Sequence, residues 1–227
     1  MSLYVMADFH LCFGANDKPM DIFGKKWEGY MEKIEHSCKV LESEDTLVIP
    51  GDISWATYLS SCVEDLKFID ALPGRKIISK GNHDYWWTSA KKLGEMKEKY
   101  GLSSIHFLHN NHYMYEDICL CGNRGWISGG GADDKKIYDR EIMRLEFSLK
   151  SAPAENEKIV FTHFPVVYGN VVDNNVLPLL VKNNVKRCYY GHLHGLEDGA
   201  APEGKIHGIE FKLVSADYLD FKPYKII

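Results

Sequence analysis

The chain has 227 residues, of which 45% are hydrophobic and 12% aromatic, enough to bury a substantial core. This length is common for one α/β domain, so we expect residues 1–227 to form a single domain. The 27 lysines and arginines against 32 aspartates and glutamates give a formal net charge of -5, which provides no broad attraction for long nucleic acid or an anionic membrane. No window approaches the roughly 18 uncharged apolar residues of a membrane span, and no signal segment is recognisable, so we expect a soluble, cytoplasmic protein.

The first part of the chain alternates short apolar runs with helical patterns. Residues 3–7 and 46–50 are nearly continuous apolar runs that each lead to an aspartate, as buried strands ending in a loop do. Between them, apolar residues recur at three- and four-residue spacings over residues 27–41, which predicts a helix. A second helix is expected at about residues 62–72, followed by a strand at residues 76–79. This is the rhythm of repeated βαβ units.

The rest of the chain continues this pattern with one change. Residues 105–108, 112–115 and 118–121 have the composition of sequential strands joined by Asn-Asn and Glu-Asp turns, which predicts antiparallel growth of the sheet. Residues 122–131 are too rich in glycine for a regular element, and we expect a mobile loop there. The remaining predicted elements are helices at about residues 89–100, 138–149 and 175–181, and strands at residues 158–162, 186–190 and 209–213.

Side chains suited to metal binding or acid–base chemistry follow directly after several predicted strands. In open α/β sheets the carboxyl ends of the strands form one edge of the molecule, so loops far apart in sequence can converge there. Each short motif alone is a weak signal, because D-x-H and G-D arise by chance and an aspartate after a strand often only caps a helix. The residues in question are Asp8, His10, Asp52, Asn82, His83, His163, His192 and His194.

These motifs are far more specific in combination. In chain order they read D-x-H, G-D, G-N-H-D, H and G-H-x-H, each placed after a predicted strand. The pattern resembles that of the calcineurin-like metallophosphoesterase superfamily, in its small bacterial-type members, over nearly the whole chain. The resemblance implies an α/β fold, namely a four-layer α/β/β/α sandwich with two central mixed β-sheets. It also implies a dinuclear metal centre where the two sheets meet at the strand ends.

The resemblance implies a role for each of these residues. Asp52 would bridge the two metal ions, and a hydroxide held between the ions would attack the phosphorus atom. His83 would remain unbound and act as the general acid that protonates the departing oxygen, with Asp84 orienting its ring. The first metal would be bound by Asp8, His10 and His194, and the second by Asn82, His163 and His192.

The chemistry of these ligands restricts the metals. Imidazole and carboxylate groups together suit Mn, Fe, Zn, Co or Ni better than Mg, which prefers oxygen ligands and water. Neutral imidazoles and an amide oxygen also complete the shells without neutralising the positive charge that acidifies a bound water. We therefore expect two divalent transition-metal ions as cofactors, Mn or Fe with Zn as the alternative.

A second group of histidines offers an alternative metal site. His106, His109 and His112 have H-x-x-H-x-x-H spacing. Because they fall on a predicted strand, a turn and the next strand, their side chains share no helical face, and Asn110-Asn111 has the composition of a hairpin connection. We therefore expect these histidines to bind no metal.

The substrate is less constrained than the chemistry. Protein Ser/Thr phosphatases of the superfamily carry Asp-Arg-Gly shortly after Gly-Asp, whereas residues 53–56 here read Ile-Ser-Trp-Ala, and Asp84 stands where those enzymes carry glutamate. DNA-repair nucleases of the superfamily usually add a capping domain and a basic surface. We therefore expect a small phosphoester substrate, first a phosphodiester, with phosphomonoesters or nucleotides as the alternative. A catalytically silent interaction scaffold is disfavoured because no ligand of the pattern is missing.

Two further side chains are expected to bind the substrate. Trp55, just after the bridging aspartate, can form a wall of the pocket. Arg124, within the glycine-rich segment, can contact the non-reacting oxygens of the phosphate group. Nothing in the sequence indicates a protein partner.

Overall fold

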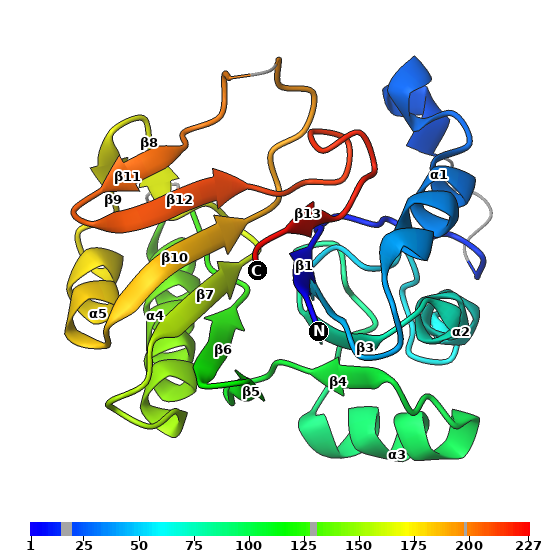
Figure 1. The fold of residues 1–227 in the computed structure, drawn as a ribbon, viewed down its shortest axis with the longest axis horizontal. Coiled ribbons are helices and arrows are strands. Elements are labelled where there is room, and N and C mark those ends of the chain that lie inside the picture. The colour runs from blue at the N-terminus through cyan, green and yellow to red at the C-terminus, as the bar shows by residue number, and fades with distance from the viewer. Residues whose placement is uncertain (15–19, 128–130, 198) are drawn as a thin grey trace.

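Two β-sheets form the centre of the computed structural model, which describes residues 1–14, 20–127, 131–197 and 199–227 (Figure 1). The first sheet has the strand order β13 (Tyr224–Lys225), β1 (Leu3–Val5), β2 (Thr46–Pro50), β3 (Arg75–Ser79) and β4 (Ile105–Phe107). The second has the order β11 (Gly204–Ile206), β12 (Ile209–Leu213), β10 (Val185–Tyr190), β7 (Lys158–Thr162), β6 (Ile118–Asn123) and β5 (Tyr113–Tyr115). Both sheets are parallel at their centres and carry antiparallel edge strands, namely β13, β11 and β5. The predicted α/β class with two mixed sheets is confirmed.

Helices cover the outer side of each sheet, as Figure 1 shows on its right and left. On the side of the first sheet lie α1 (Tyr30–Ser37), α2 (Val63–Ala71) and α3 (Ala90–Tyr100), and on the side of the second lie α4 (Ala132–Ser151) and α5 (Val176–Lys182). A small hairpin, β8 (Val167–Tyr168) with β9 (Val171–Val172), precedes α5. Among the described residues, no helix has the length and apolar character needed to span a membrane.

The hydrophobic core consists of three clusters that follow this layering. On β2, Leu47 and Ile49 pack toward the helices of the first sheet, whereas Val48 packs between the two sheets. Side chains of the second sheet, including Ile159 and Phe161, complete the cluster between the sheets. A strand that is buried on both faces needs apolar residues at every position, which explains why these strands read as continuous apolar runs in the sequence.

The two sheets are joined by backbone hydrogen bonds just past the ends of β1 and β12. The Ala7 amide donates to the Val214 carbonyl at 2.8 Å, and the Ala216 amide donates to the Ala7 carbonyl at 3.0 Å. These bonds place the loops after β1, β2 and β3 beside those after β7, β10 and β12. The polar residues of both sheets therefore meet at one edge of the molecule.

The chain changes sheet between β4 and β5, contrary to the predicted run of sequential antiparallel strands. Only the antiparallel pairing of β5 with β6 is confirmed. β4 pairs with β3 in parallel, so Asn110 and Asn111 do not form a hairpin within one sheet. Leu108 of the crossing segment and Tyr115 of β5 pack into the cluster between the sheets. A pattern of apolar residues indicates a strand but not the strand with which it pairs. The change of sheet could therefore not be predicted from the sequence.

Two predicted boundaries also differ. α4 begins at Ala132, before the predicted start at residue 138. Asp133 and Asp134 lie in its first turn, where carboxylates are stabilised by the positive end of the helix dipole. Gly122 and Asn123, assigned to the loop, complete β6, and residues 128–130 of the predicted mobile loop lie outside the described residues.

The helix predicted at residues 27–41 is shorter and divided. α1 covers only Tyr30–Ser37, between 3-10 turns at Lys25–Trp27 and Cys38–Val40. Gly29 interrupts the pattern with a φ of 60°. The apolar spacing extends beyond α1 because the flanking 3-10 turns bury side chains on the same side of the segment, including Trp27 and Cys38.

A buried lysine closes the turn between α2 and β3, and its removal should destabilise the fold. The Lys76 ammonium is fully buried and donates to the carbonyls of Asp70 at 3.1 Å, Gly74 at 2.8 Å and Leu72. Because Lys76→Met leaves these carbonyls unpaired, we expect the free energy of unfolding to fall by about 2–4 kcal/mol in urea titrations. Lys67→Met, an exposed lysine of α2, is the control and should change it by less than about 0.5 kcal/mol. Equal effects of the two substitutions would contradict this assignment.

Candidate metal centre

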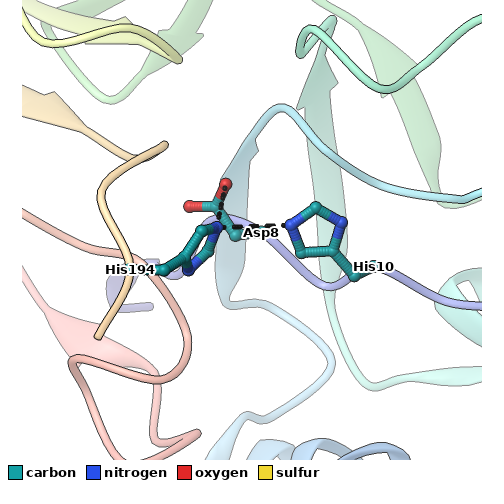
Figure 2. A group of neighbouring side chains, drawn as sticks. All are labelled: Asp8, His10 and His194. Atoms are coloured by element: carbon teal, nitrogen blue, oxygen red, sulfur yellow. Dashed lines mark hydrogen bonds and ion pairs between the residues drawn. The ribbon is translucent and has the colours of Figure 1, made fainter. Parts of the chain in front are cut away.

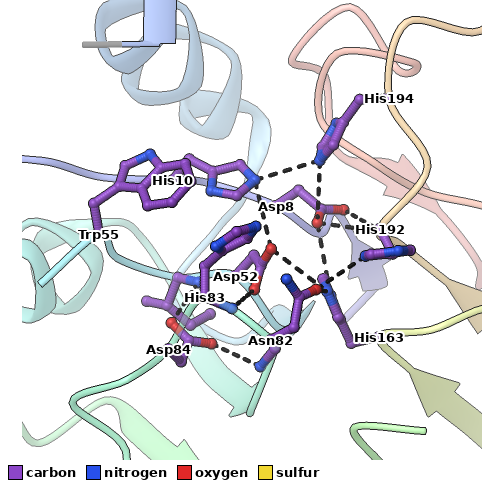
Figure 3. A network of polar contacts seen from close by, with 12 residues as sticks. Asp8, His10, Asp52, Trp55, Asn82, His83, Asp84, His163, His192 and His194 are labelled. Atoms are coloured by element: carbon purple, nitrogen blue, oxygen red, sulfur yellow. Dashed lines mark hydrogen bonds and ion pairs between the residues drawn. The ribbon is translucent and has the colours of Figure 1, made fainter. Parts of the chain in front are cut away.

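The side chains singled out by the motifs converge at the edge where the two sheets meet, as Figure 3 shows. They come from the loops that follow five parallel strands. Asp8 and His10 follow β1, and Asp52 follows β2. The loops after β3, β7 and β10 supply Asn82 with His83, His163, and His192 with His194.

One group of donor atoms consists of Asp8, His10 and His194, whose ligand atoms all lie within 4.8 Å of one another (Figure 2). The Nε2 atoms of His10 and His194 are 3.3 Å apart. The His194 Nε2 atom is also 3.6 Å from Oδ1 of Asp8. These are the three residues assigned to the first metal from the sequence.

A second group lies directly beside the first. Ligand atoms of Asp8, Asp52 and His163 lie within 4.8 Å of one another. The Asn82 amide oxygen is 2.6 Å from Nε2 of His163 and 2.9 Å from Nδ1 of His192, which brings together the three residues assigned to the second metal. Oδ2 of Asp52 is 3.7 Å from the His10 Nε2 atom and 3.5 Å from that of His163, so this carboxylate lies between the two groups.

The backbone is strained at several of these donors. Asp8, His10, Asp52 and His192 have φ values of 62°, 46°, 49° and 72°, in the left-handed region that non-glycine residues rarely occupy. Such conformations cost of order 1–3 kcal/mol each and persist only where the surrounding structure enforces them. Four of the predicted metal ligands therefore have a strained backbone.

Two glycines of the motifs make room for the carboxylates. A Cβ atom on Gly81 would lie 2.1 Å from Oδ1 of Asp52, and one on Gly191 would lie 2.4 Å from Oδ2 of Asp8. The loops that carry Asn82 and His192 therefore press against the carboxylates of the neighbouring strand ends. This close approach explains why glycine precedes each of these two residues in the motifs.

His83 and Asp84 occupy different environments. The His83 backbone amide donates to Oδ1 of Asp52 at 2.8 Å, while its ring lies 4.5 Å from the Trp55 ring (Figure 3). The Asp84 carboxylate is fully buried and accepts hydrogen bonds from the amides of Ile53 at 2.9 Å and Gly81 at 2.7 Å, among others. Asp84 thus ties together the loops that carry Asp52 and His83. A direct action of Asp84 on the His83 ring stays a prediction.

A cavity of about 440 Å³ opens onto the donor atoms and has an apolar wall. Trp55 stacks on His10 with ring centres 4.9 Å apart and an interplanar angle of 22°, in the position expected for a pocket wall. Trp27, which the sequence analysis did not single out, lies edge-on to both His10 and His194. The cavity is lined by His10, Met20, Phe23, Lys26, Trp27, Asp52, Trp55, His83, His192, His194, Gly195 and Asp217. Arg124 lines a different cavity.

The sequence matches a known protein family. The family model described as calcineurin-like phosphoesterase matches residues 1–196. The chain belongs to the calcineurin-like phosphoesterase family. Membership identifies the protein as a metal-dependent hydrolase of phosphoesters, and the predicted resemblance is confirmed. Among curated proteins, the comparison found no significant match.

Solved structures support the fold of this calcineurin-like phosphoesterase. The phosphopantetheinyl hydrolase of Mycobacterium tuberculosis is 12% identical, with a TM-score of 0.62 over 100% of this chain and 95% of that one. A protein of unknown function from Aquifex aeolicus is 21% identical, with a TM-score of 0.54 over 99% and 95% of the two chains. A protein of Thermus thermophilus, TT1561, is 10% identical, with a TM-score of 0.55 over 98% and 96%. At these identities the likeness concerns the fold alone.

The electrostatics of the phosphoesterase site fit divalent metal ions. Burial lowers the pKa of His10 to about 3 and that of His192 to about 4, so both imidazoles are neutral and able to donate a lone pair at neutral pH. Burial opposes ionisation of Asp52, but the neighbouring His163 and His10 outweigh it and hold the pKa of this carboxyl below its usual range. Two buried carboxylates, with imidazole nitrogens facing each other at 3.3 Å, form a donor set that a cation would satisfy.

Asp217 is a residue of the site that the sequence analysis missed. Its Oδ1 atom is 2.8 Å from Nδ1 of His194, and its Oδ2 atom accepts the Gly195 amide at 2.9 Å. With the proton on Nδ1, the Nε2 lone pair of His194 faces Asp8 and His10, as a metal ligand requires. The available signal was an aspartate shortly after the predicted strand at residues 209–213, at the same edge as the other donors.

Loss of the Asp217 charge should weaken metal binding without abolishing it. We expect Asp217→Asn to lower the affinity for Mn²⁺ or Zn²⁺ by about 10–100-fold, because His194 loses the partner that fixes its ring and raises its basicity. Competition with a chromophoric chelator measures this. Asp220→Asn, which changes an exposed carboxylate of the same segment, is the matched control. Equal metal affinities of the two variants would show that Asp217 does not support metal binding.

Metal affinity should increase with pH. Burial disfavours the charged form of His194, but Asp8 and Asp217 outweigh it and raise the pKa to about 9. Below this pH a metal ion must displace a proton from Nε2, so the apparent affinity should fall by about tenfold per pH unit from pH 8.5 to 6.5. Titration calorimetry in two buffers of different ionisation enthalpy should show about one proton released per chain at pH 7.5. An affinity independent of pH would contradict this.

Proposed function

We propose that this protein is a phosphohydrolase that uses two divalent transition-metal ions and prefers phosphodiesters. The observation that carries the proposal is the convergence of two overlapping donor groups, sharing Asp8, at the floor of a cavity that also contains His83. Asp8, His10 and His194 would hold the first ion, and Asn82, His163 and His192 the second, with Asp52 between them. A purely structural metal site would need neither a cavity nor a shared carboxylate.

The protein's own residues would orient the substrate and move a proton. Two bound ions would supply Lewis-acid polarisation of a phosphoryl oxygen and activation of water. His83 lines the cavity beside Asp52, where its imidazole would protonate the oxygen of the departing alcohol. Asp52 holds the His83 backbone through its amide, and the Trp55 ring packs against the imidazole, so His83 is held on a fixed segment.

The apolar wall supports an organic group on the phosphate. Trp27, Trp55, Met20 and Phe23 line the cavity next to the donor atoms and can cover a nucleoside, aryl or alkyl group of the substrate. A phosphodiester carries two such groups, a monoester only one. The phosphopantetheinyl hydrolase of similar fold is named for a substrate with an organic group on its phosphate, which is compatible with this preference.

A screen of substrates with defined metals tests the proposal. The metal-free protein, supplied with Mn²⁺, Fe²⁺ or Zn²⁺, is assayed on aryl and alkyl phosphodiesters, the matching monoesters and nucleotides, ranked by kcat/KM. We expect activity that depends on the metal, and the diester of each matched pair to be the better substrate. Higher kcat/KM values for the monoesters would mean that the protein is a phosphomonoesterase that uses the same residues. Failure to hydrolyse any of these compounds would support a silent scaffold.

The identity of the metals is open to direct measurement. We propose Mn or Fe, with Zn as the alternative, because mixed imidazole and carboxylate donors accept several ions of this series. Elemental analysis of protein purified without added metal should find about two ions per chain. A content dominated by magnesium would contradict the proposed class of ion.

A further inference from the structure

A second cavity, of about 510 Å³, gathers basic side chains. Lys80, Arg124, Arg144 and His109 line it, together with hydroxyl-bearing residues at the start of α3. The cavity adjoins two of the metal-binding loops. Lys80 directly precedes the Gly-Asn-His-Asp motif, and the Arg124 carbonyl accepts the amide of His163 at 3.1 Å. A group bound in this cavity would therefore be next to the metal-binding loops.

The two arginines are held in place by one buried carboxylate. It belongs to Glu141 of α4, whose Oε1 atom is 3.2 Å from Nη2 of Arg124 and 2.7 Å from Nη1 of Arg144. Glu141 is 2% exposed, and its Oε2 atom accepts a hydrogen bond from Asn123 at 3.2 Å. The Arg124 guanidinium also lies 4.7 Å from the Trp126 ring centre, which fixes its plane. This is a positioned pair of guanidinium groups rather than two solvated side chains.

The cavity has an excess of positive charge. Glu141 balances one of the two arginines with which it pairs, and Lys80 forms no ion pair with the part of the chain that the structure describes. Lys80, Arg124 and Arg144 therefore leave two uncompensated positive charges in a chain whose net charge is -5. Like charges held together in a half-buried cavity repel one another, and an anion entering the cavity would relieve that repulsion.

We propose that this cavity binds a second phosphate group of the substrate, distinct from the phosphoester that is cleaved. The statement that this phosphate belongs to the substrate rests on the proposed function. The substrate class is then small phosphoesters that carry an additional terminal phosphate. Planar guanidinium groups and an ammonium are the donors that best match phosphate oxygens. The net negative charge of the chain disfavours a long polyanion, which would extend beyond the cavity. Arg124 thus contacts a remote phosphate in place of the reacting one.

Binding of inorganic phosphate tests the cavity without any turnover. Titration calorimetry of the metal-loaded protein should show one phosphate fewer per chain in the double variant Lys80→Ala/Arg144→Ala than in the wild type. The matched control is Lys91→Ala, an exposed lysine of α3 outside the cavity, which should retain the wild-type stoichiometry. Equal stoichiometry and affinity in the double variant and the wild type would overturn the proposal. This measurement does not depend on phosphoesterase activity, so it tests the cavity even if the proposed function fails.

A matched pair of substrates tests the link to catalysis. Thymidine 5′-(4-nitrophenyl phosphate) is compared with the same compound carrying a 3′-phosphate. We expect kcat/KM to be higher for the 3′-phosphorylated compound by about tenfold, the change that one charge-assisted hydrogen bond produces. The ratio should fall toward one in Lys80→Ala and stay at the wild-type value in Lys91→Ala. A ratio near one in the wild type, or an unchanged ratio in Lys80→Ala, would overturn the assignment to a substrate phosphate.

Discussion

Replacing His83 with alanine is expected to lower kcat by about 10²–10⁴-fold while both metal ions remain bound. The His83 ring lines the cavity, whereas the contact with Asp52 is made by the His83 backbone amide, which alanine keeps. The substitution therefore removes the proton donor and leaves the hydrogen bond that holds the carboxylate. Metal content by elemental analysis and kcat on a phosphodiester measure the two effects separately.

The dependence on leaving group separates acid catalysis from a general loss of structure. A nitrophenolate departs readily without a proton, whereas an alkoxide does not, so the His83→Ala defect should be larger for an alkyl than for a nitrophenyl diester. His36→Ala, which changes an exposed histidine of α1, is the control and should retain wild-type kcat on both substrates. Wild-type rates of His83→Ala on the alkyl diester would show that His83 is not the general acid.

The residues that converge could be predicted because each one follows a parallel strand, and the strands β1 and β2 are apolar on both faces. Asp8 and Asp52 stand directly after such runs, and the carboxyl ends of parallel strands share one edge of a sheet. The positions of these donors could therefore be predicted from the local sequence, without knowledge of the tertiary structure. The glycines before Asn82 and His192 added a second local signal, since a side chain there would collide with a carboxylate.

Features that depend on contacts between distant segments were not predictable in the same way. The sequence shows Asp217 as one aspartate among many, and only the approach of the segment after β12 to His194 reveals its contact. Arg124 was expected at the reacting phosphate, but Glu141, far along the chain in α4, holds its guanidinium in the neighbouring cavity. The change of sheet between β4 and β5 has the same origin, because strand partners are chosen by packing between the sheets.

Replacing Asp52 with asparagine is expected to have the largest effect, reducing the metal content to one ion or none per chain. Asparagine retains an oxygen for the His83 amide but removes the negative charge that lies between His10 and His163. Asp8 would then be the one carboxylate left among the predicted ligands, facing the charge of two divalent cations. The activity should fall further than the roughly 10²–10⁴-fold expected for loss of a general acid, because the ions themselves are lost.

Thermal unfolding measures the same loss independently of activity. A metal ion that binds only the folded protein raises its stability by RT ln(1 + [L]/Kd), about 2.7 kcal/mol at a concentration of 100 Kd. Adding Mn²⁺ should therefore raise the Tm of the wild type and of His83→Ala, and raise that of Asp52→Asn much less. If Asp52→Asn bound two ions with wild-type affinity, the charge of Asp52 would not be needed between the metals. Asp8, whose Oδ1 atom lies 3.6 Å from Nδ1 of His163 and 3.6 Å from Nε2 of His194, would then be the bridging carboxylate.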